Sequence, residues 1–246
     1  MTNDEKQLSI LLIPGHWLGA WAWDAVAQQL SEAGHNPIAL TLPGLDPEDA
    51  QRSRRTVEDQ AAAIERELVE ATSSGKPSAV IVAHSGANAP VSVVLDRHPQ
   101  RVQRVIWVDS GPVASGSAFA PDLPAEIEEL PLPPFDALGQ QASLEGLSAE
   151  DLERFRSRAV AEPGPVLRQP VTLDNDERLD VPTTLVCCSI STAQIRELIA
   201  AGHPMFAEAG RLTQADYLDL PTGHWPMWSR PAELAELIVS AVSPAR

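Results

Sequence analysis

The sequence predicts an α/β protein, a doubly wound and mostly parallel sheet with an inserted helical cap. Two observations carry this prediction. Short apolar runs alternate with helical periodicity over residues 8–108 and again over 182–242, and such alternation is typical of parallel sheets covered by helices. Between these stretches, residues 113–180 break the rhythm. The 246 residues, 43% of them hydrophobic, are enough for one large domain with a sizeable core.

Each expected element has a local signal in the chain. Apolar runs bounded by turn residues predict strands at residues 8–13, 37–41, 79–83, 102–108, 182–189 and 217–220. Helical periodicity predicts helices at residues 23–33, 56–73, 88–96 and 231–242. Thr56 is a suitable N-cap for the second of these helices, and Pro231 stands at the start of the last, where proline is tolerated.

The predicted cap covers residues 113–180, so the core consists of residues 1–112 and 181–246. The cap holds eight of the 22 prolines and 14 acidic against 5 basic residues. A helix is expected at 148–161, with Ser148 as its N-cap. A mobile linker is the alternative, but the leucine and phenylalanine content favours a segment that folds over the edge of the sheet.

The formal net charge of −16 argues against binding to nucleic acids or anionic membranes. The N-terminal residues 1–7 are polar, and no apolar run reaches the length of a membrane span. We therefore expect a cytoplasmic protein that acts on a small molecule. The sequence gives no indication of its oligomeric state.

The only cysteines, Cys187 and Cys188, are adjacent in an expected strand, which disfavours a disulfide between them. No spacing of cysteine and histidine typical of a metal site occurs.

A serine directly follows the apolar run at residues 80–83, in Ala83-His84-Ser85-Gly86-Ala87. A serine at a sharp strand-to-helix turn presents its hydroxyl above the sheet edge, where a base can reach it. Small neighbours are required in so tight a turn. The usual pattern has glycine on both flanks, whereas this chain has alanine at 83 and 87, so the match is a relaxed one.

A serine nucleophile needs a general base, and His224 is the best placed histidine. It lies in a loop after the last expected strand and before the final helix, from which its ring can reach the strand ends. The alternative is an ordinary histidine of a surface loop. The order of strand, serine turn and late histidine favours catalysis.

These features resemble the α/β-hydrolase superfamily over essentially the full length of the chain. The resemblance rests on the Ser85 turn, the Gly223-His224 loop, and residues 13–17 and 19–23 after the first strand. The last of these is similar to the cofactor-free branch that contains esterases, lactonases and hydroxynitrile lyases. The resemblance implies a serine hydrolase that needs no metal or organic cofactor.

The resemblance also assigns an oxyanion hole, formed by the backbone N–H groups of His16 and Gly86. The chain departs from the family at Pro14, where a histidine with a mainly structural role is usual. It departs again in the side chain of His16. That ring either faces the pocket as an extra donor or packs under the cap without a chemical role.

The acid of a triad is harder to place. Family members most often carry it after the strand expected at 182–189, but no carboxylate follows there. Asp109 ends the strand after the serine helix, 24 residues beyond Ser85. Haloalkane dehalogenases and a group of lactonases carry their acid at this alternative place. One rival interpretation is that Asp109 only caps its turn. Another is that Asp216 or Asp219 is the acid instead. The acidic residues within 174–180 look like a solvated run and are not candidates for the acid.

Tryptophan accounts for six of the eleven aromatic residues. Three tryptophans flank the expected catalytic loops, and together with nearby apolar residues they are candidates to wall a substrate pocket, although packing in the core is the alternative for each. The candidate pocket residues are Trp17, Trp225, Met227, Trp228, Phe119 and Phe135.

The sequence thus predicts a serine hydrolase that cleaves a small-molecule ester or lactone through Ser85, His224 and Asp109, with an acyl-enzyme intermediate. One alternative is a cofactor-free lyase of the hydroxynitrile-lyase type. Such lyases tend to have a lysine near the histidine, and neither Lys6 nor Lys76 is so placed. The other alternative is a non-catalytic protein of this fold that binds a small ligand.

Overall fold

The computed structural model describes residues 7–73 and 78–243. Its centre is a sheet of six parallel strands in the order β2-β1-β3-β4-β7-β8. The strands are β1 (Ser9–Ile13), β2 (Asn36–Ala39), β3 (Ala79–His84), β4 (Val102–Val108), β7 (Thr183–Cys187) and β8 (Ala215–Asp219). The predicted α/β fold class is confirmed, and each expected strand is present with small shifts at its ends.

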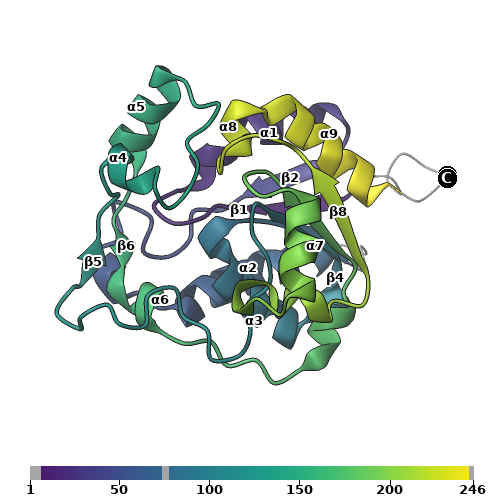
Figure 1. Cartoon of the computed structure of the whole chain (residues 1–246), viewed down its shortest axis with the longest axis horizontal. Coiled ribbons are helices and arrows are strands. Elements are labelled where there is room, and N and C mark those ends of the chain that lie inside the picture. The colour runs from purple at the N-terminus through teal and green to yellow at the C-terminus, as the bar shows by residue number, and fades with distance from the viewer. Residues whose placement is uncertain (1–6, 74–77, 244–246) are drawn as a thin grey trace.

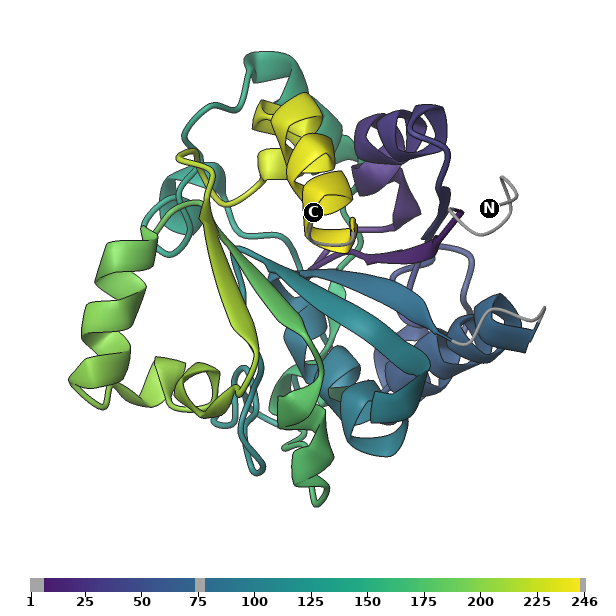
Figure 2. The same ribbon diagram turned by 90° about the vertical axis from the view of Figure 1, so that its right-hand side faces the viewer.

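Helices cover both faces of the sheet (Figures 1 and 2). On one face α1 (Asp24–Glu32) packs against α9 (Pro231–Val242), and on the other α2 (Val57–Ser73) packs against α3 (Asn88–Arg97). Side chains of β1 alternate between the two cores, with Leu11 on the α2 side and Leu12 on the α1 side. This burial on both faces explains why the strands read as continuous apolar runs.

Most of the predicted cap, residues 113–180, lies beside the carboxyl ends of the strands (Figure 1), whereas its last residues return along the end of α3 to the start of β7, where Asn175 donates hydrogen bonds to Asp96. The predicted cap contains a two-stranded antiparallel sheet of β5 (Glu129–Leu130) and β6 (Glu162–Pro163), and the helices α4 (Phe135–Leu138), α5 (Ala149–Arg158) and α6 (Gly164–Arg168). Ser148 caps α5 in a capping box, as expected. The fully buried Phe155 of α5 packs on Trp225 and Trp228. The boundaries of the cap as a separate unit stay a prediction.

Two helices of the core were not expected from the sequence. They are α7 (Thr192–Ala200), between β7 and β8, and the single turn α8 (Pro226–Ser229) before α9. A signal for α7 was present, because Ser191 and Gln194 form a capping box at its start.

The described ranges 7–73 and 78–243 also show the state of the two cysteines and the character of the helices. Cys187 and Cys188 are free and buried, as expected for strand neighbours. In these ranges no helix has both the length and the apolar character needed to cross a bilayer.

Candidate active site

Backbone strain is concentrated where the central strands end. Among the described residues, the non-glycine residues with positive φ are Trp17 (65°), Ser85 (50°) and Asp109 (44°). They follow β1, β3 and β4, which are neighbours in the sheet. A left-handed conformation costs such residues about 1–3 kcal/mol and persists only where the surroundings enforce it, typically at functional sites. The strain therefore points to this sheet edge.

Ser85 stands at the turn between β3 and α3, in a short 3₁₀ segment at Ser85–Ala87. The turn is held from two sides. The hydroxyl of Ser110 donates a hydrogen bond to the backbone carbonyl of Ser85 at 2.8 Å. The loop after β1 presses against it so closely that a Cβ on Gly15 would lie 2.8 Å from the Cβ of Ser85. Only glycine fits there, which keeps the loop against the serine.

The structure brings Ser85, His224 and Asp109 into one chain of hydrogen bonds. Nε2 of His224 lies 2.7 Å from Oγ of Ser85. Nδ1 of the same ring lies 2.6 Å from Oδ2 of Asp109. With its proton on Nδ1, the ring donates to the carboxylate and accepts from the serine hydroxyl, which is the arrangement of a nucleophile, a general base and an orienting acid.

Asp109 reaches from the end of β4 into the loop after the neighbouring strand β7. Its Oδ1 accepts hydrogen bonds from the backbone N–H groups of Cys188 and Ser189, and its Oδ2 accepts one from the Ser189 hydroxyl. Burial acts to raise the pKa of Asp109, but the hydrogen bonds from His224 and Ser189 outweigh it and hold the pKa below its ordinary value. The carboxylate therefore stays ionised beside His224.

The rival carboxylates have other partners. Asp216 forms an ion pair with Arg104 at 3.0 Å, and Asp219 accepts a hydrogen bond from the backbone N–H of Thr192 at the start of α7. In the acidic run before β7, Asp176 pairs with Arg178 and Arg211. Of these candidates, Asp109 is the one in contact with His224.

His84, next to the nucleophile, was not selected from the sequence. Its Nε2 lies 2.7 Å from the backbone carbonyl of His224, to which it donates a hydrogen bond. Burial, followed by the nearby His224, lowers the pKa of His84 to about 3, so the ring is neutral at neutral pH. Its position directly before Ser85 was the available signal, but its partner, 140 residues away, was not visible in the sequence.

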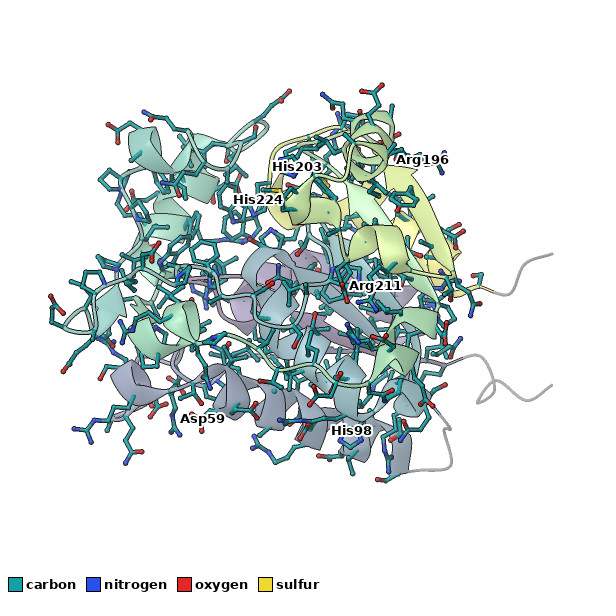
Figure 3. All side chains as sticks on the ribbon, turned by 60° about the horizontal axis from the view of Figure 1, so that its bottom comes forward. Asp59, His98, Arg196, His203, Arg211 and His224 are labelled. Atoms are coloured by element: carbon teal, nitrogen blue, oxygen red, sulfur yellow. The ribbon has the colours of Figure 1, made fainter. Side chains whose placement is uncertain are left out.

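The loop that carries His224 is held by backbone hydrogen bonds to residues of the predicted cap. The backbone N–H groups of Gly223 and His224 donate to the carbonyls of Glu145 and Ser143. A Cβ on Gly223 would lie 2.5 Å from one of these carbonyl oxygens and 2.6 Å from the other. His224 lies on the opposite side of the molecule from Asp59 and His98, which are on the α2 and α3 side (Figure 3).

The expected oxyanion residues lie side by side. Gly86 follows Ser85, and the imidazole of His16 occupies the space that a Cβ on Gly86 would need. The structure thus places the His16 side chain at the site, between Gly86 and the cap residue Glu162. Glu162 was not selected from the sequence, because an acidic residue in a two-residue strand has no periodic signal.

The six candidate pocket residues divide between the site and the core. Trp225 packs edge-on against the His224 ring, with the ring centroids 4.9 Å apart, and Phe119 packs against the His16 ring at a centroid distance of 4.5 Å. Trp17 is buried, and its indole N–H donates to the carbonyl of Leu130. The remaining three pack in the core or against α5: Met227, which is fully buried, Trp228, which stacks on Trp21, and Phe135, which contacts Phe155.

A family model for the alpha/beta hydrolase family matches residues 10–237. The chain belongs to this family. Among curated members, a putative chloroplastic methylesterase 12 of Arabidopsis thaliana is 28% identical over 115 residues, which are 45% of this chain and 32% of that protein. Methylesterase 7 of the same plant is 27% identical over 122 residues, 49% of this chain and 44% of that protein. The matches thus span less than half of these relatives.

Solved structures of family members cover almost the whole chain. An extracellular alpha/beta-hydrolase of a Paenibacillus species has a TM-score of 0.73 at 20% identity, over 95% of this chain and 98% of that one. The Arabidopsis methylesterase MES16 has a TM-score of 0.70 at 16% identity, over 96% and 98%. At such identities the likeness establishes the fold.

Proposed function

We propose that this protein is a serine hydrolase that cleaves a small carboxylic ester through Ser85, His224 and Asp109. The observation that carries the proposal is the continuous hydrogen-bond chain from the serine hydroxyl through both ring nitrogens of His224 to a buried carboxylate. The strained backbone at Ser85 and Asp109 supports it, because the fold maintains this costly geometry at two members of the same chain.

The proposed reaction has two halves. His224 removes the proton of Ser85, whose oxygen attacks the ester carbonyl, and the backbone N–H groups of His16 and Gly86 stabilise the negative oxygen that develops. His224 then protonates the departing alcohol, which leaves an acyl-enzyme. A water activated by His224 releases the acid and restores Ser85. Apart from this water, the proposed steps use only side chains and backbone of the protein.

Methyl esters of small carboxylic acids are the first substrates to test. The curated relatives carry the name methylesterase, and one of the solved relatives is a methylesterase as well. Lactones are the second class, since the same attack on a carbonyl opens a cyclic ester. The location of the protein in the cell stays a prediction; the relatives include a chloroplastic and an extracellular protein.

The decisive experiment compares wild type with Ser85→Ala on p-nitrophenyl and methyl esters and on lactones of graded size. We expect turnover by wild type, its loss in Ser85→Ala, and covalent labelling of Ser85 by a fluorophosphonate. Equal turnover by both proteins contradicts the proposal. Cleavage of cyanohydrins without labelling of Ser85 supports the lyase alternative. The lysine that such lyases tend to have cannot be placed, because Lys6 and Lys76 lie outside the described residues. Binding without any turnover supports the ligand-binding alternative.

A further inference from the structure

The side chain of His16 is held by a buried carboxylate of the cap. Its Nδ1 lies 3.2 Å from Oε2 of Glu162, and only 8% and 1% of the two side chains are exposed. The same carboxylate oxygen accepts a hydrogen bond from the backbone N–H of Trp17 at 3.0 Å. A buried carboxylate is costly unless a donor or a positive charge compensates it. A proton on Nδ1 of His16 supplies that compensation and fixes the orientation of the ring.

The opposite edge of the His16 ring faces the nucleophile turn. Nε2 points at Gly86, where a Cβ would overlap it. Nε2 is buried, and within the part of the chain that the structure describes it has no hydrogen-bond partner. A buried polar atom without a partner is rare and calls for an explanation, since each such atom costs about 1–3 kcal/mol. A partner that arrives with the substrate explains it.

We infer that the His16 side chain is a third donor to the oxyanion, and that Glu162 is the residue that positions it. The inference rests on the proposed hydrolase function. Gly86 follows the nucleophile, and its N–H is one of the two proposed backbone donors. A ring nitrogen directed at Gly86 therefore lies beside the oxygen on which negative charge develops, where a preorganised donor contributes most.

The proton of this donor stays on the ring throughout the reaction. An imidazolium paired with the Glu162 carboxylate leaves Nε2–H free to donate to the carbonyl oxygen. When the Ser85 oxygen bonds to the carbonyl carbon, the π electrons of the carbonyl group move to the carbonyl oxygen. The hydrogen bond from Nε2–H to this carbonyl oxygen then strengthens. When the tetrahedral intermediate expels the alcohol, the carbonyl forms again and the bond weakens. The ring therefore acts by charge and hydrogen bonding alone.

Phe119 of the predicted cap covers the His16 ring, with the two ring centroids 4.5 Å apart. Because 59% of Phe119 is exposed, a substrate can reach Nε2 by displacing this side chain into solvent. The titratable groups around His16 are Glu162 on the cap side and His84 at the sheet edge, and the ring of His84 lies in turn beside that of His224. Burial and His224 lower the pKa of His84 to about 3, so His84 does not titrate in the working range.

The test measures kcat and KM for one neutral ester, and the inhibition constant of an alkylboronic acid, in wild type, His16→Phe, His16→Gln and Glu162→Gln. We expect His16→Phe to lower kcat/KM by about 10²- to 10³-fold, mainly through kcat, and to weaken boronate binding. His16→Gln keeps an amide donor and recovers part of the loss. Glu162→Gln removes the charge that holds the ring, so we expect it to lower kcat and weaken boronate binding while KM changes little.

A matched control is His98→Phe. His98 also faces a glutamate, with Nε2 3.8 Å from Oε1 of Glu65, but on the α3 side far from the site. We expect it to match wild type. The inference is overturned if His16→Phe and His16→Gln retain the wild-type kcat and boronate binding. If His16→Phe does not fold, His16→Gln and Glu162→Gln still decide through kcat and boronate binding. Failure of the hydrolase proposal is a separate result, namely equal turnover by Ser85→Ala or no labelling of Ser85.

Discussion

Asp109 leaves β4 in a strained conformation and receives hydrogen bonds from His224, from the Ser189 hydroxyl and from two backbone N–H groups after β7. In the more common family arrangement that loop carries the acid itself. In the triad proposed for this protein, the loop contributes donors and the neighbouring strand contributes the carboxylate. Because parallel neighbours end at the same sheet edge, a carboxylate from either strand can reach the same histidine.

Replacing Asp109 by asparagine tests this assignment. The neutral amide cannot stabilise an imidazolium, and it favours the wrong tautomer of His224, so we expect kcat to fall by about 10³- to 10⁴-fold with little change in KM. The matched control is Ser189→Ala, which removes one hydrogen bond and keeps the carboxylate, at a cost below about tenfold. Steady-state kinetics with one ester measure both. Full activity of Asp109→Asn removes Asp109 from the triad and leaves Ser85 and His224 in place.

His84 makes stability depend on pH. Because its pKa is lowered from 6.5 to about 3 in the folded protein, the unfolded chain binds a proton between these values that the native protein does not. Stability therefore falls as the pH falls below about 6.5, by about 2 kcal/mol between pH 7 and pH 5. The lowered pKa of Asp109 acts in the same direction at lower pH, below its ordinary value of 3.8.

Urea unfolding of wild type and His84→Gln at pH 7 and pH 5 measures this contribution. Glutamine keeps an amide donor for the His224 carbonyl but has no proton to gain, so we expect the variant to lose about 2 kcal/mol less than wild type over this range. Parallel losses in the two proteins contradict a neutral buried His84.

At the residue level, sequence reasoning could find the three groups of the proposed triad from their identity and their place in the order of elements. Ser85, His224 and Asp109 each follow a strand, and the structure joins them. His84 and Glu162 were missed because their significance lies in partners 140 and 146 residues away. Such tertiary pairs leave no periodic signal in one sequence.

The elements were predictable to the extent that their periodicity was strong. The helices at 24–32, 57–73 and 231–242 bury one face each and were expected within one or two residues. The strands β5 and β6 have two residues each, too few for any alternation to show. Their pairing nevertheless places Glu162 against the loop after β1, so the least predictable element carries a contact on which the role proposed for His16 depends.

The contact between the cap and the His224 loop gives a prediction for Gly223→Ala. The added methyl group meets two backbone carbonyl oxygens at 2.5 and 2.6 Å, and these cannot rotate away as a side chain would. The loop must shift, which moves the imidazole from its position over Ser85. We expect kcat/KM to fall by about 10²-fold, since misplacement by about 1 Å has that effect.

Gly111→Ala is the matched control for Gly223→Ala. It lies two residues after Asp109, and the closest atom to its added Cβ is 3.9 Å away, an ordinary contact. We expect near wild-type kinetics and thermal unfolding. Equal activity of Gly223→Ala and wild type shows that the contact with the cap does not position His224, whereas an equal loss in both glycine variants shows a general sensitivity of the region.

For the molecule as a whole, the excess of 34 acidic over 18 basic residues gives a prediction about substrates. A net charge of −16 repels anionic esters at long range. Salt shortens the Debye length from about 30 Å at 0.01 M to about 8 Å at 0.15 M, so the repulsion fades as salt is added. We expect kcat/KM for a half-ester of a dicarboxylic acid to rise up to about tenfold over this range.

The control is a neutral ester of the same size. Its kcat/KM should change little with salt, because a neutral molecule is not repelled by the net charge. An anionic ester that is preferred at low salt instead locates the decisive charge at the site, where the imidazolium proposed for His16 is the nearest candidate.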